Sequence, residues 1–249
     1  MSEGAWIQAV RGAVGGAWRG RREVLDLALT AVLAGGHLLL EDVPGVGKTT
    51  LALALSRALG GSFRRVQGTS DLLPGDLTGV LVLEGGGLVF REGPLFAQVV
   101  LVDEVNRMPP RTQSALLEAM SEGAVTVDGV TRRLPAPFLV LATQNPLDMQ
   151  GSFPLPESQL DRFLLRVRLG YPSREDERRV LRQGAAGPVL PEAVASVEEV
   201  RQAMARVDEV KVLEPVEEWM LDLVGASRRD NRLLRGGRPR GAQIGRAHV

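Results

Sequence analysis

The sequence predicts an α/β protein in which a parallel sheet is flanked by helices and followed by a smaller, all-helical part. Short apolar runs without polar alternation recur up to about residue 169, as expected for strands that are covered on both faces. Segments with helical periodicity separate these runs. Beyond residues 170–172 only helical patterns remain, so we place a domain boundary there.

The composition is that of an ordinary globular protein: 44% of the 249 residues are hydrophobic and 24% are charged. The 30 Lys and Arg residues equal the 30 Asp and Glu residues, so no overall field attracts nucleic acid or a membrane surface. The absence of cysteine excludes disulfides, thiolate metal sites and cysteine nucleophiles. No apolar run is long enough for a membrane helix and no secretory signal is recognisable, so we expect a cytoplasmic protein without membrane contact.

Two helices are expected before the first strand. Apolar residues recur every four positions over residues 1–19, which predicts an amphipathic helical extension that Gly15 and Gly16 interrupt. The apolar positions of residues 22–34 predict a second, well-buried helix, and the Gly35-Gly36 pair ends it.

The stretch from His37 to Thr50 predicts a strand, a glycine loop and a helix. Glycines let consecutive backbone N–H groups turn inward around phosphate oxygens, and the N-terminus of the following helix adds positive partial charge. Lys48 would reach the β- and γ-phosphates, and the Thr49 hydroxyl would hold Mg²⁺. The residues expected to contact the nucleotide here are Pro44, Gly45, Val46, Gly47, Lys48, Thr49 and Thr50.

One position departs from the general phosphate-loop pattern, which begins with glycine where this chain has Asp42. Asp adopts left-handed backbone angles more readily than most residues, so the loop can still close with the carboxylate turned away from the phosphates. The alternative is a glycine-rich turn with a chance Gly-Lys-Thr. The strand before the loop and the helix after it favour the phosphate loop.

A second apolar run, Val99 to Val102, ends in two adjacent carboxylates. Adjacent residues on an extended strand point to opposite sides, so Asp103 and Glu104 cannot do the same job. In phosphoryl-transfer enzymes with this layout, the first carboxylate assists the Mg²⁺ shell and the second activates the attacking water. We therefore assign Asp103 to the metal and Glu104 to the water.

Further strands are expected over residues 63–67, 138–142 and 164–169. Asn145 follows the second of these, where its amide could orient the attacking water; the alternative is a turn former before a proline. Arg162 precedes the third, where it either pairs with Asp161 or acts in the active site of a neighbouring molecule.

Two hairpins and several helix starts complete the pattern. Apolar runs around three glycines over residues 71–93 predict a projecting hairpin, and Asp128-Gly129 predicts a tight two-residue turn. Pro109-Pro110 begins a helix, and Ser173 and Ser196 each precede an acidic residue at the spacing of a capping box. The arginine-rich residues 228–240 favour a solvated surface over a nucleic-acid patch.

Several strings resemble one family. They are Asp103 to Arg107, Thr112 to Met120, Ala142 to Pro146 and Leu155 to Phe163. Together with the phosphate loop they closely resemble the MoxR family of AAA+ ATPases over about residues 20–240. The resemblance implies a P-loop NTPase core over residues 1–170, with a helix-2 insert and a pre-sensor-1 hairpin facing a pore, and a helical lid over residues 171–243. It also implies bound ATP and Mg²⁺ and a homo-oligomeric ring, a hexamer.

By matching position, the resemblance makes Asn145 the first sensor, Arg162 the arginine finger that acts on the next subunit's nucleotide, and Arg240 the second sensor. The family's Ser-Pro-Arg-Ala pattern stands here as Arg-Pro-Arg-Gly, a departure on both sides of the Pro-Arg pair. Family members continue for a helical stretch past that arginine, so we expect an incomplete lid. Residues 244–249 resemble a translated sequencing adapter, and we interpret them as a non-native tail.

The first functional hypothesis is an ATP-hydrolysing ring motor that remodels or matures partner proteins in a chaperone-like way, with a von Willebrand A-domain protein as the partner the resemblance implies. A DNA-handling AAA+ motor is the second. Neutral charge and hairpins with few basic residues beyond Arg132 and Arg133 argue against it, so we expect no nucleic-acid partner. A magnesium-chelatase ATPase subunit is the third, and a nucleotide-binding scaffold without turnover is disfavoured by Glu104.

Overall fold

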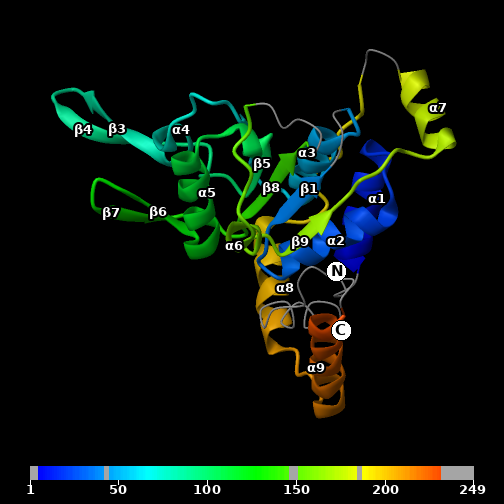
Figure 1. The fold of residues 1–249 in the computed structure, drawn as a ribbon. Coiled ribbons are helices and arrows are strands. Elements are labelled where there is room, and N and C mark those ends of the chain that lie inside the picture. Colours follow the sequence, from blue (N-terminus) through cyan, green and yellow to red (C-terminus); the bar gives the residue numbers. More distant parts are fainter. Residues whose placement is uncertain (1–4, 42–44, 146–150, 184–186, 231–249) are drawn as a thin grey trace.

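A five-stranded parallel sheet forms the centre of the computed structural model, which describes residues 5–41, 45–145, 151–183 and 187–230 (Figure 1). Its strand order is β2-β5-β8-β1-β9. The strands are β1 (Leu38–Glu41), β2 (Phe63–Gln67), β5 (Val99–Asp103), β8 (Leu139–Gln144) and β9 (Leu165–Val167). The predicted parallel α/β fold is therefore confirmed, and the strand before the glycine loop lies between β8 and β9.

Both faces of the sheet are covered, which explains why its strands are apolar throughout. Leu38 and Leu40 point to the face packed with α1 (Ala5–Ala17), α2 (Arg22–Leu33) and α3 (Lys48–Ala58). Leu39, between them, points to the other face, where α5 (Pro110–Glu122) packs. Because side chains alternate along a strand, this pattern also decides which strand-end residues lie on the α3 side.

Helix α1 differs from the expectation of an interrupted helix, because it runs without a break through Gly15 and Gly16. Two glycines disfavour a helix by about 1 kcal/mol each. Burial of Trp6, Val10 and Val14 against α3 outweighs that cost.

The two predicted hairpins are confirmed, and they project from the same side of the molecule (Figure 1). The first consists of β3 (Gly79–Glu84) and β4 (Gly87–Glu92), preceded by α4 (Pro74–Thr78); the second consists of β6 (Ala124–Val127) and β7 (Val130–Arg133). Asp128 and Gly129 both have positive φ, at 48° and 75°, as a type I′ turn requires. The hairpins touch where the Arg132 guanidinium lies 3.9 Å from the centre of the Phe90 ring.

The remaining helical segments of the described chain lie after β5. They are the 3₁₀ turn η1 (Val105–Arg107), α6 (Glu157–Leu160), α7 (Arg174–Gln183), α8 (Val197–Glu209) and α9 (Glu214–Arg229). Ser173 and Ser196 accept hydrogen bonds from the backbone N–H groups of Asp176 and Glu199, so both predicted caps are confirmed. Helix α8 packs on α2 through Val200, whereas α9 buries none of its side chains in the described part of the chain.

Within the described residues, no helix is both long and apolar enough to cross a membrane. The division into a core over residues 1–170 and a lid over residues 171–243 stays a prediction.

Candidate active site

The carboxyl ends of β1, β5 and β8 meet at one edge of the sheet, beside a cavity of about 340 Å³. Ligands of open α/β sheets bind at this edge, and the volume is that of a small-molecule site. The cavity is lined by Gly45, Gly47, Lys48, Thr49, Thr50, Arg65, Gln67, Asp103, Glu104, Thr143 and Asn145. The structure thus brings together most of the residues that the sequence singled out.

The glycine loop is built for close approach of a ligand to the backbone. Gly45 and Gly47 both have a φ of 89°, which L-residues rarely adopt. Gly47 directly precedes α3, whose first turn carries no side-chain cap, and a helix start of this kind accepts anions. Val46 packs its side chain into the core, so its contribution to a ligand would come from its backbone. Pro44 and Asp42 lie outside the described residues.

Asp103 and Glu104 line the same cavity, which differs from the expectation that they point to opposite sides. Strand β5 ends at Asp103, and Glu104 adopts left-handed angles, with a φ of 57° and a ψ of 52°. Its backbone N–H donates to Thr143 Oγ1 at 2.9 Å, which holds this turn. The two side chains do not point to opposite sides, because the extended backbone ends at Asp103 and does not include Glu104. A strained non-glycine residue of this kind is frequent at functional sites.

Strand β2 supplies a polar partner for each carboxylate. Arg65 donates from Nε to Asp103 Oδ2 at 2.7 Å, and Gln67 donates from Nε2 to Glu104 Oε2 at 3.0 Å. Neither residue was among the site residues predicted from the sequence. Their alternate positions on a predicted strand were the available signal, but the neighbouring strand was not known before the structure placed β2 beside β5.

Of the two predicted residues Asn145 and Arg162, only the first lies at the strand-end cavity. Asn145 follows β8 and lines the cavity, where a first sensor is expected. Arg162 does not line it: this exposed arginine donates from Nη1 to Ser121 Oγ at the end of α5. Arg240 lies outside the described residues.

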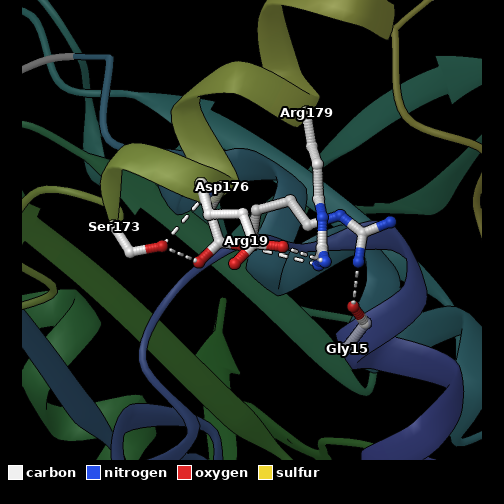
Figure 2. Close-up of polar contacts among 6 residues, drawn as sticks. Gly15, Arg19, Ser173, Asp176 and Arg179 are labelled. Carbon is white, nitrogen blue, oxygen red and sulfur yellow. Dashed lines mark hydrogen bonds and ion pairs between the residues drawn. The ribbon is translucent and has the colours of Figure 1, made fainter.

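Trp18 connects the glycine loop to a second cavity, of about 400 Å³, between α1, α2 and α7. A Cβ at Gly47 would lie 3.1 Å from Trp18 Nε1, so the indole lies directly against the loop. The far wall of the cavity comes from α7, where Arg179 Nη1 lies 3.7 Å from Asp176 Oδ1 (Figure 2). Arg19, beside them, donates to the Gly15 carbonyl at 3.0 Å. From the sequence, Trp18 was only one of the apolar residues of the helical extension expected over residues 1–19.

Comparison with known proteins agrees with this geometry. The model of the "ATPase family associated with various cellular activities (AAA)" matches residues 37–165. The chain is 45% identical to Chaperone MoxR1 of Mycobacterium tuberculosis over 172 residues, which are 68% of this chain and 46% of that protein. It is 34% identical to Protein MoxR of Paracoccus denitrificans over 198 residues, 77% of this chain and 57% of that protein. The chain belongs to the MoxR-type AAA+ ATPases.

Two further matches extend over nearly the whole MoxR-type chain. YeaC of Bacillus subtilis, an uncharacterised protein, is 46% identical over 227 residues, which are 90% of this chain and 71% of YeaC. A crystal structure of a candidate ATPase from Cytophaga hutchinsonii superposes with a TM-score of 0.89 at 35% identity, covering 98% of this chain and 78% of that one. The predicted family and fold are therefore confirmed. The chain spans about half the length of the two relatives named MoxR and MoxR1.

The residues around the strand-end cavity suit a magnesium-bound nucleotide. Mg²⁺ is usually held by one or two protein oxygens together with phosphates and water. The Thr49 hydroxyl and the Asp103 carboxylate supply such oxygens in one cavity, and Lys48 supplies a cation for the phosphates. The site of this MoxR-type chain thus contains oxygen ligands suited to Mg²⁺ and a cation suited to the phosphates of ATP.

Proposed function

We propose that this MoxR-type chain binds ATP with Mg²⁺ at the strand-end cavity and hydrolyses it. The observation that carries the proposal is that Asp103 and Glu104 line one cavity with Lys48 and Thr49. Mg²⁺, when bound, would offset negative charge on the phosphates. Thr49 and Asp103 would hold the ion, and Lys48 would contact the phosphates.

Glu104 acts as the general base in this proposal. Gln67 holds one of its carboxylate oxygens, which leaves the other to accept a proton from water. The water oxygen bonds to the γ-phosphorus while the bond to the β,γ-bridging oxygen breaks, and ADP and phosphate leave. The Asn145 amide, directly after the end of β8, orients the water.

The nucleoside fits the second cavity, on the Trp18 side of the glycine loop. Trp18 lines this cavity and lies against Gly47, so a base held there would lie close to phosphates held at the loop. An aromatic ring gives a base a stacking surface. Asp176 and Arg179 of α7 close the cavity from the other side, which would link nucleotide binding to the position of this helix.

Assembly into a ring, a hexamer in our proposal, gives Arg162 its role. This arginine is exposed and lies outside its own cavity, as a residue that acts on a neighbour's γ-phosphate must. The first projecting hairpin exposes Leu83 and Leu88, and the second exposes Val130; these apolar side chains suit contact with a protein client. We place such a ring in the cytoplasm and propose remodelling of partner proteins, with a von Willebrand A-domain protein as the first to test.

The decisive experiment is the Glu104→Gln variant of the full chain. Loss of a general base lowers turnover by about 10²–10⁴-fold, whereas ATP affinity, measured with a fluorescent analogue, should remain that of the unaltered protein. Glu118→Gln, an exposed change on α5, is the matched control and should leave turnover unchanged. Undiminished hydrolysis by Glu104→Gln would reject the assignment. If it is inactive, the same variant serves as a trap for client proteins.

A further inference from the structure

We propose that Arg65 is a further phosphate-binding residue of this site and that it competes with Mg²⁺ for Asp103. In this proposal the arginine pairs with Asp103 when the metal is absent and turns to the phosphate chain when the metal arrives. The inference rests on the proposed function, since it assumes that ATP and Mg²⁺ bind this cavity.

Both oxygens of Asp103 have protein partners. Arg65 Nε donates to Oδ2 at 2.7 Å, and Thr143 Oγ1 donates to Oδ1 at 3.3 Å. The Asp103 side chain is only 11% exposed, and the Arg65 guanidinium offsets its charge at short range. A metal ion that takes an Asp103 oxygen must share or displace one of these partners.

It is unfavourable for Arg65 and Mg²⁺ to bind the Asp103 carboxylate at the same time. A guanidinium and Mg²⁺ on one carboxylate lie within a few ångströms of each other, where like charges repel strongly in a partly buried site. Mg²⁺ also requires near-ideal octahedral geometry, which the fixed fork of the guanidinium restricts. Thr143 is neutral and offers no such conflict, so Arg65 is the partner that metal binding displaces.

Arg65 has both the freedom and the chemistry to move to a phosphate. It lies on the edge strand β2, and its side chain is 51% exposed, so leaving Asp103 disrupts no buried packing. It already lines the same cavity as Lys48 and Asp103. Guanidinium groups bind phosphate oxygens through two parallel hydrogen bonds, and these charge-assisted bonds are among the strongest in proteins.

The surrounding charges favour movement of the Arg65 side chain from Asp103 to the phosphates. Glu104 is held by Gln67 and lies 3.5 Å from Arg107 Nη1, so it already has partners other than Arg65. Arg64, the preceding residue, alternates to the opposite side of β2 and does not line the cavity. The phosphate chain is therefore the anion that Arg65 can reach within the cavity once Asp103 binds the metal.

The test is equilibrium binding to the full chain without turnover. Displacement of a fluorescent nucleotide by ADP and by a non-hydrolysable ATP analogue is followed across a series of free Mg²⁺ concentrations and in excess chelator. The variants are Arg65→Gln, which keeps a hydrogen-bond donor but removes the charge, and Arg64→Gln as the matched control on the same strand. Arg65→Lys keeps the charge without the fork and serves if Arg65→Gln does not fold, as judged by thermal unfolding.

Two shifts are expected for Arg65→Gln, each of about tenfold, the size of one charge-assisted hydrogen bond. The Mg²⁺ concentration for half-maximal ATP-analogue binding falls, because the competing cation is gone. The preference for the triphosphate over ADP also falls. Arg65→Lys should retain the Mg²⁺ requirement and lose part of the triphosphate preference, and Arg64→Gln should change neither.

A residue that only supports the fold would lower both nucleotide affinities together and would not improve the response to Mg²⁺. An unchanged or increased Mg²⁺ requirement in Arg65→Gln, or an unchanged triphosphate preference, overturns the proposal. If the unaltered protein binds nucleotide normally, such a result leaves the proposed ATPase function standing. If the unaltered protein binds none, both proposals fall.

Discussion

Gln67 Nε2 donates to Glu104 Oε2 across 3.0 Å, which ties the edge strand β2 to the carboxylate that we assign to water activation. The register of β2 on β5 places Gln67 opposite Asp103. Glu104, one residue further, turns back towards Gln67 through its left-handed backbone. The orientation of the proposed base thus depends on a residue from another strand.

We expect Gln67→Ala to lower the kcat for ATP hydrolysis by about tenfold, because a general base that loses its orienting hydrogen bond spends less time in reach of the water. The KM for ATP should stay nearly constant, since Gln67 contacts the base and not the proposed phosphate ligands. Steady-state kinetics separates the two. Gln202→Ala, an exposed change on α8, is the control, and a raised KM with unaltered kcat would refute this role.

Trp18 is expected to carry much of the affinity for the nucleoside. Trp18→Leu retains an apolar side chain in the core but removes the ring, and stacking of a base on an aromatic ring contributes about 1–3 kcal/mol. We therefore predict an affinity for ATP reduced by about tenfold or more, measured by fluorescent-nucleotide displacement.

Trp219→Leu is the matched control, because Trp219 is 62% exposed on α9. It should bind ATP as the unaltered protein does. Equal affinities of the two tryptophan variants would show that the base is held elsewhere.

Glu41 forms an ion pair with Arg166 on β9 and accepts a hydrogen bond from Gln144 at the end of β8. The Glu41 side chain is 2% exposed, whereas that of Arg166 is 56% exposed. The two ends of this pair should therefore differ in what their loss costs. Removing Arg166 leaves the buried Glu41 carboxylate without its ion-pair partner. Neutralising Glu41 leaves Arg166, which water can solvate.

We predict that Arg166→Met destabilises the chain by about 3 kcal/mol and Glu41→Gln by about 1 kcal/mol, as measured by urea unfolding. Arg179→Met breaks an exposed pair with Glu175 on α7 and should cost about 0.5 kcal/mol or less. A larger loss for Glu41→Gln than for Arg166→Met would contradict the burial argument.

Arg162 is predicted to act on the nucleotide of an adjacent subunit. Arg162→Ala should lower ATP turnover by about 10³-fold or more, the usual effect of losing an arginine finger. Arg168→Ala, an exposed change close by, should have little effect. Mixing Arg162→Ala chains with Lys48→Ala chains should restore part of the turnover, because some interfaces then join an intact nucleotide site to an intact arginine. Mixtures no more active than either variant would argue against action between subunits.

The features that were predictable are local in the chain. The turn at Asp128-Gly129 follows from the backbone preferences of two adjacent residues, and the strand, loop and helix around Gly45 and Gly47 follow from glycine geometry and apolar runs. The predicted interruption of α1 at Gly15 and Gly16 was wrong. The low helix propensity of glycine costs about 1 kcal/mol per residue, and burial of apolar side chains against α3 outweighs it.

By itself, the sequence determined that this protein has a parallel α/β sheet with a glycine loop and an acidic strand end, because each of these is encoded by neighbouring residues. Which side chains meet there depends on how distant segments pack together. The pairing of β2 with β5 brought Arg65 to Asp103 and Gln67 to Glu104, and the turn at Glu104 placed both carboxylates in one cavity. Strand order and register are set by packing between distant segments, so no local pattern could have predicted these contacts.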